Sequence, residues 1–146
     1  MAKFVYRMQN ILNIKQKLET QAKMEYSDAN QNYREQQEIL NGYMIRRMQY
    51  EKHWKEQMKG NIDLASVQHA REDANTMKTI VRRQMMEVHK AEKELEDARE
   101  KLNTVMQERK IQEKLRDKAF EDFKQELAHE ETKEIDELVS YTHNKG

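Results

Sequence analysis

The residues of this chain that could do chemistry are five histidines and many carboxylates, since the sequence contains no cysteine. Zinc sites need several nitrogen or sulfur ligands at set spacings, such as two histidines four residues apart on a helix. No two of these histidines have that spacing. His129 beside Glu130 could make only a casual surface contact to a metal, and pairs such as Glu130 and Glu134 arise by chance on a Glu-rich helix. We therefore expect no metal site, no cofactor and no catalytic residue.

Nucleotide and nucleic-acid chemistry find no support either. There is no glycine-rich loop to cradle a phosphate, so the chain is not a P-loop enzyme. A basic-region zipper needs a dense block of Lys and Arg, whereas residues 46–47 and 82–83 are only arginine doublets. The ten methionines suit either a shallow surface that several partners share or irregular filling of a core. We expect a protein that is not an enzyme and binds no nucleic acid.

The elements that must carry these residues are long helices, because the chain has no proline and only three glycines. Both residue types destabilise a helix interior. Charged residues (37%) match hydrophobic ones (36%), which leaves enough apolar side chains for a stripe along a helix but too few for a globular core. The one good turn is Gly60-Asn61-Ile62-Asp63. We predict an all-α fold, an elongated antiparallel two-helix coiled-coil hairpin in a single domain over residues 1–146. Helix 1 spans about residues 3–59, the turn about 60–66 and helix 2 about 67–140, with Asp63 or Ser66 as the cap of helix 2.

The apolar pattern predicts which helix faces meet. Helix 2 alternates steps of four and three from Met77 to Val105, and small alanines at some layers leave room for the tyrosines of helix 1. Helix 1 is less regular, since consecutive four-residue steps from Leu18 to Ala22 to Tyr26 break a strict heptad. Its predicted seam also includes Phe4, Met8, Ile11, Ala29, Tyr33, Leu40, Tyr43, Tyr50 and Trp54. The predicted hairpin core consists of Val81, Val88, Leu95, Leu102 and Val105.

The hairpin predicts an overhang. With the turn centred on Asp63, facing residues have numbers that sum to about 126, so that Phe4 lies near Asp122 and residues after Gln125 have no partner within the chain. Residues 117–146 carry nine acidic and four basic side chains, whereas residues 1–60 carry eleven basic and seven acidic ones. The overhang thus presents acidic side chains either to solvent or to a basic partner. These are Glu130, Glu131, Glu134, Asp136 and Glu137.

The sequence has no run of about 18 apolar residues, so we predict no membrane span. Its first four residues do not begin the apolar core of a signal peptide. A cytoplasmic protein is the default expectation.

Three segments resemble the FliJ family of the flagellar type III export apparatus. Residues 3–12 (KFVYRMQNIL) resemble the family opening Phe-x-(Phe/Tyr)-Arg-(Leu/Met)-Gln-x-(Ile/Leu)-Leu. Residues 108–115 (ERKIQEKL) look like its Glu-Arg-Lys-x-x-Glu-Lys-Leu stretch, and residues 131–137 (ETKEIDE) like its closing Glu-x-Lys-x-x-Asp-Glu segment. The three matches occur in the family order and span nearly the whole chain.

The resemblance implies a hairpin similar to the central stalk of rotary ATPases, in a protein that is required for flagellum assembly and hence for motility and chemotaxis. Such a protein inserts its open end into the hexameric export ATPase and stimulates it, together with the regulator of that ATPase. It also contacts the membrane protein of the export gate and escorts export chaperones. The implied location is cytoplasmic and peripheral, on the cell membrane at the flagellar base, and we expect a monomer.

The resemblance and the predicted overhang together assign partner contacts. The family's gate-contacting stripe falls on Met77, Ile80 and Gln84, although Asp73 stands where the family has an aromatic residue. The predicted contacts with the ATPase ring are Phe4, Met8, Ile11, Leu127, Glu131, Glu134, Ile135, Asp136, Glu137 and Leu138.

Two other functions fit the same pattern. A generic scaffolding coiled coil would dimerise and bind no ATPase. The equivalent stalk of a virulence-type secretion system would share the fold, and only the N-terminal segment favours the flagellar system.

Overall fold

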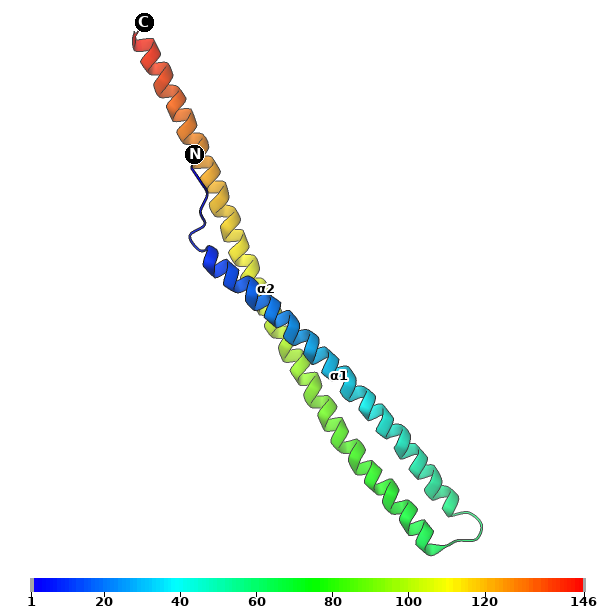
Figure 1. The fold of residues 1–146 in the computed structure, drawn as a ribbon. Coiled ribbons are helices and arrows are strands. Elements are labelled where there is room, and N and C mark those ends of the chain that lie inside the picture. Colours follow the sequence, from blue (N-terminus) through cyan, green and yellow to red (C-terminus); the bar gives the residue numbers. More distant parts are fainter. Residues whose placement is uncertain (1, 146) are drawn as a thin grey trace. The chain divides into compact units, whose positions relative to one another are not determined.

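Two helices make up the fold. The computed structural model describes residues 2–145, in which α1 spans Gln9–Gln57 and α2 spans Leu64–Lys145 (Figure 1). No strand occurs among these residues. The all-α helical hairpin predicted from the sequence is confirmed. The bounds differ from the prediction, since α1 begins at residue 9 instead of 3 and α2 runs from 64 to 145 instead of 67 to 140.

The first residues are not helical, so the predicted helix start is wrong. Residues 2–6 are irregular and Arg7 and Met8 form a turn. The backbone amide of Gln9 donates to the Tyr6 carbonyl oxygen over 3.2 Å. The ring of Phe4 packs edge-on against Phe120, with 5.0 Å between ring centroids. This aromatic contact holds the irregular segment against α2.

The turn between the helices has two local causes. Gly60 has a φ of +72°, the left-handed conformation that glycine adopts without steric cost after a helix. Asp63 caps α2, because its carboxylate accepts from the Ala65 amide at 3.3 Å and from the Ser66 hydroxyl at 2.8 Å. Of the two cap residues that the sequence suggested, the structure selects Asp63.

Each helix lies partly in one and partly in the other of two compact units. Unit 1 consists of the described residues up to Gln21 and those from Asn103 onward, and unit 2 consists of Ala22–Leu102. The pairing is antiparallel in unit 1, where Lys15 bonds Glu108, and in unit 2, where Glu25 bonds Lys101, both at 2.8 Å. The single domain over residues 1–146 stays a prediction.

The side chains of the seam predicted for α2 are buried to different degrees. Val81 is fully buried and Leu95 and Val105 nearly so, while Val88 and Leu102 are half-buried. The buried stripe begins earlier than the sequence analysis placed it, because Ala70 and Ala74 are also buried. Small alanines at these layers allow a close approach of the facing helix.

The predicted seam of α1 is wrong near the start of the helix. Leu12 is 2% exposed and Glu19 is 7% exposed, whereas Ile11 and Leu18 are 37% and 38% exposed. Steps of three and four then lead from Leu12 through residues 15, 19, 22, 26, 29, 33, 36 and 40, all buried or half-buried. The seam of α1 therefore follows a regular heptad repeat that includes polar residues. The sequence analysis followed the apolar neighbours Ile11 and Leu18 instead, and so missed this repeat near the start of the helix.

Candidate partner-binding site

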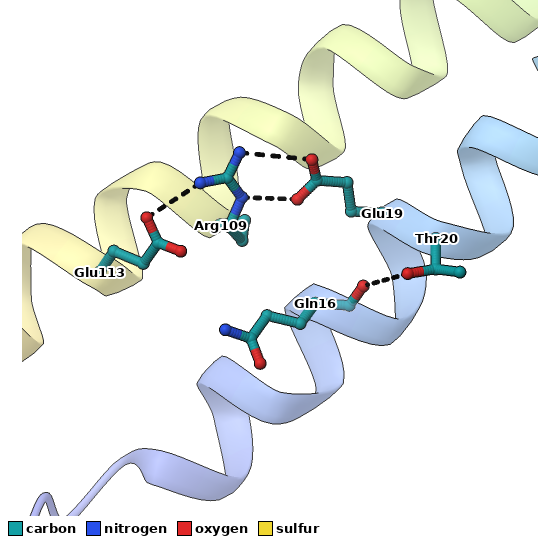
Figure 2. Close-up of polar contacts among 5 residues, drawn as sticks. All are labelled: Gln16, Glu19, Thr20, Arg109 and Glu113. Atoms are coloured by element: carbon teal, nitrogen blue, oxygen red, sulfur yellow. Dashed lines mark hydrogen bonds and ion pairs between the residues drawn. The ribbon is translucent and has the colours of Figure 1, made fainter.

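A polar layer interrupts the apolar seam in unit 1 (Figure 2). The Arg109 guanidinium donates two hydrogen bonds to the Glu19 carboxylate, at 2.5 and 3.3 Å, and a third to Glu113 at 2.9 Å. Glu19 belongs to α1, whereas Arg109 and Glu113 lie one turn apart on α2. On α1, Thr20 donates to the Gln16 carbonyl oxygen. The layer thus ties the two helices together by a two-pronged ion pair instead of by apolar contact.

The electrostatics of the layer favour the charged form. The hydrogen bond to Glu19 raises the pKa of Arg109 above its usual value, against the opposing effect of burial. A basic group with a raised pKa stabilises the fold at every pH below its unfolded pKa, and that contribution is lost only as the pH rises through the folded pKa. The guanidinium therefore stays charged throughout the range in which proteins are studied.

An aromatic cluster lies farther along unit 1. Phe4 contacts Phe120 and Phe123, with 5.0 and 5.5 Å between the ring centroids. These partners lie where the sequence placed them, on either side of Asp122. A groove of about 590 Å³ lies between the N-terminal residues 3–8 and α2, where Leu115, Ala119, Asp122, Phe123 and Glu126 line it.

The C-terminal part of α2 carries most of the predicted ring-contact residues. Every residue from 128 to 144 is exposed, and Leu127 is half-buried. Ile135 and Leu138 are 59% and 64% exposed, large fractions for apolar side chains. The predicted contacts on this segment are therefore accessible to a partner, as are Met8 and Ile11, while Phe4 is half-buried.

Two of the three predicted gate contacts are not accessible, which corrects the sequence-based assignment. Met77 and Gln84 are buried in the seam of unit 2, and Ile80 is half-buried. The Gln84 amide nitrogen donates to the backbone and side-chain oxygens of Gln36, at 3.0 and 2.7 Å. Because these side chains hold α1 and α2 together, a gate contact through Met77 and Gln84 would require the helices to separate.

The sequence analysis did not predict the pair of Glu19 and Arg109. Arg109 lies four residues after Val105 and so continues the alternating steps of the α2 seam. This spacing is the feature of the sequence that places Arg109 in the seam. Glu19 follows Leu12 by seven residues and gives the matching signal on α1. The seam predicted for α2 runs into Arg109 beyond Val105, whereas Glu19 is charged and stands next to Leu18, which the apolar pattern places in the seam of α1.

The comparisons with known proteins identify the family. The family model described as "Flagellar FliJ protein" matches residues 4–146. The chain belongs to the FliJ family. This membership relates it to flagellar protein export. Comparisons with curated proteins and with solved structures find no match.

Two further observations concern membranes and metals. Among residues 2–145, neither helix of this FliJ-family chain is apolar enough over a sufficient length to cross a bilayer. Within the same residues, no group of three or more histidines and carboxylates could hold a metal ion.

Proposed function

We propose that this FliJ-family chain is a non-enzymatic stalk component of the flagellar type III export apparatus that binds the export ATPase ring and stimulates it. The observation that carries this proposal is the exposed segment 128–144 of α2, in which Ile135 and Leu138 stand among acidic residues. Ile135, Leu138 and Val139 are exposed neighbours at helical spacing, and contiguous apolar patches of this kind mark binding surfaces. The carboxylates Glu131, Glu134, Asp136 and Glu137 would face a basic lining of the ring.

The other roles of the proposed function follow from the family. We propose that the chain, a monomer in isolation, works in the cytoplasm at the membrane of the flagellar base, with the ATPase regulator, the export gate and export chaperones as partners. Gate binding through Met77 and Gln84 is not part of this proposal, since both are buried.

A truncation that ends at Gln125 tests ring binding. We expect the truncated chain to keep α1 and the paired part of α2, so its helicity per residue by circular dichroism stays near that of the full chain. Stimulation of the purified hexameric ATPase should be lost, and co-purification with the ring should fail. Full stimulation by the truncated chain would refute the proposed contact.

A matched control separates charge from apolar contact. A variant with glutamine at 131, 134 and 137 keeps the length and the apolar side chains of the segment, so it should bind the ring more weakly and with a smaller dependence on salt. Unchanged binding and salt dependence would show that the carboxylates make no contact with a basic lining.

The two alternative functions have their own tests. Sedimentation of a stable dimer in place of a 17.7 kDa monomer would favour a scaffolding coiled coil. Genomic neighbourhood would distinguish a flagellar stalk from that of a virulence-type system.

A further inference from the structure

The first residues of the chain lie as a strap against α2 in unit 1 (Figure 1). Residues 2–8, the N-terminal strap, are not helical, and α1 begins only at Gln9. The contact of the strap with α2 is aromatic. The phenyl ring of Phe4 packs against those of Phe120 and Phe123, with 5.0 and 5.5 Å between the ring centroids.

The N-terminal strap occupies the place on α2 where the seam with α1 would otherwise continue. Ala119 lies two heptads after Val105, and Phe123 lies two heptads after Arg109, so both are seam positions. Both are half-buried, and both line the groove of about 590 Å³ beside residues 3–8. The strap therefore stands in for α1 over the last layers of the seam.

Few side chains hold the N-terminal strap in place. Phe4 and Tyr6 are half-buried, whereas Val5 is 80% exposed and Met8 is 41% exposed. Phe4 and Tyr6 lie two residues apart, so an extended segment turns both to the same side. The hydrogen bond from the Gln9 amide to the Tyr6 carbonyl oxygen needs no group of α2. Release of the strap therefore costs mainly the burial of two aromatic side chains.

The N-terminal strap and the surface beneath it can separate without unfolding either one. Residues 3–8 contain neither proline nor glycine, so α1 can extend over them once Phe4 leaves α2. On α2, the Lys124 ammonium lies 4.8 Å from the centroid of the Phe120 ring. This cation–π contact does not involve the strap, so it supports Phe120 after the strap has left.

The surface under the N-terminal strap adjoins the proposed ring contact. Asp122 and Glu126 line the groove beneath the strap, and the half-buried Leu127 separates them from the exposed segment 128–144. Removal of the strap would make Phe123 accessible beside that segment. The strap thus covers the stretch of α2 that directly precedes the segment proposed to bind the ATPase.

We propose that the N-terminal strap is an autoinhibitory cover that the export ATPase displaces from α2 when it binds. This inference rests on the proposed function, in which the ATPase binds segment 128–144. Displacement extends the contact with the ATPase back to Ala119 and puts an apolar side chain of the ATPase in the place of Phe4. Because a docked strap reduces the fraction of the protein that is competent to bind, it lowers the apparent affinity for the ATPase.

Two single substitutions in the full-length protein test the sign of this effect. Phe4→Ala and Val5→Ala raise helix propensity by similar amounts, but only Phe4→Ala removes the contacts with Phe120 and Phe123. Phe4→Ala should bind the purified hexameric ATPase about tenfold more tightly, since two aromatic contacts no longer hold the strap. Val5→Ala should bind like the unmodified protein, because Val5 projects away from the groove and is 80% exposed.

Fluorine NMR reports on the N-terminal strap without the ATPase. Phe4, Phe120 and Phe123 are the only phenylalanines of the chain, so fluorophenylalanine labels this cluster alone. Phe4→Ala should shift the signals of Phe120 and Phe123, whereas Val5→Ala should leave all three signals in place. Addition of unlabelled ATPase should move the Phe4 signal toward its position in a free peptide of the same N-terminal sequence.

A reducible cross-link locks the N-terminal strap on α2. The chain has no cysteine, so Val5→Cys combined with Asp122→Cys introduces the only two thiols. Both positions line the groove, and a short disulfide-containing reagent can join them while Phe4 stays docked. The locked protein should bind the ATPase about tenfold more weakly than the same sample after reduction.

Three results would overturn the proposal. Unchanged or weaker ATPase binding by Phe4→Ala is the first, and weaker binding would identify Phe4 as a direct contact with the ATPase. The others are equal affinity of the locked and the reduced protein, and signals of Phe120 and Phe123 that do not respond to Phe4→Ala. Absence of ATPase binding in every form would instead refute the proposed function and with it the inhibitory role, while the fluorine signals would still show whether the strap is docked.

Discussion

Replacing Leu12 and Leu18 separately by alanine measures where the seam of α1 runs. Both leucines lie on α1 within unit 1, so the change in intrinsic helix propensity is the same for both. Their surroundings differ, since Leu12 is nearly fully buried and Leu18 is partly exposed. The apolar pattern alone had placed Leu18 in the seam, and the structure places Leu12 there.

The expected losses follow from this burial. Leucine to alanine removes three carbon atoms, each worth about 0.8 kcal/mol when fully buried, or about 2.4 kcal/mol in total. The cavity left behind raises the cost of Leu12→Ala to about 3 kcal/mol, toward the lower end for such changes because a two-helix layer can close around the gap. Leu18→Ala should cost only about six tenths of the transfer free energy, or about 1.5 kcal/mol, because the side chain is partly exposed. This substitution leaves no enclosed cavity.

Urea denaturation followed by circular dichroism at the helical band gives the free energy of unfolding of both variants. The free energies of unfolding of the two variants should differ by about 1.5 kcal/mol, which exceeds the error of the method. The slope of the free energy of unfolding against urea concentration should be the same for both variants. If Leu18→Ala costs as much as Leu12→Ala or more, the seam does not pass through Leu12 and the register assigned to α1 is wrong.

Two further predictions use matched changes. Gly42→Ala should raise the free energy of unfolding by about 1 kcal/mol, because residue 42 is inside α1 with open space around it. Gly60→Ala should lower the free energy of unfolding by about 1 kcal/mol, because the φ of +72° at residue 60 suits glycine. Equal effects of the two substitutions in urea denaturation would contradict the turn geometry. Glu19→Arg and Arg109→Glu should each lower the melting temperature, and the double variant should recover part of the loss because the ion pair re-forms with reversed polarity while the bond to Glu113 is lost. Additive losses in the double variant would mean that the two side chains do not act as a pair.

Much of the fold could be predicted from the sequence because the determining features are local. The absence of proline fixes long helices, and the only left-handed glycine among the described residues marks the turn. The seam of α2 follows apolar periodicity because its layers are filled by valine, leucine and alanine. Register followed from the position of the turn, as the contact of Phe4 with Phe120 and Phe123 shows.

What the sequence analysis missed depends on contacts between the helices. Nothing local marks Glu19 as a buried residue, because its burial depends on an arginine supplied by the other helix. Residues 3–8 have no helix breaker, and their irregular conformation follows from the docking of Phe4 on α2. Gln84 lies on the predicted seam of α2, but its hydrogen bonds depend on the Gln36 that the other helix places opposite it. Apolar patterns report how a helix faces its surroundings but not which polar groups meet across a seam.

The ion pair of Glu19 and Arg109 joins two positions that lie 90 residues apart in the chain. Loss of either side chain alone removes the two hydrogen bonds that join the helices at this layer, whereas a joint change to well-packed apolar residues can be tolerated. We therefore expect substitutions at these two positions to be correlated among related sequences. Such correlated change would record the antiparallel pairing without any structure.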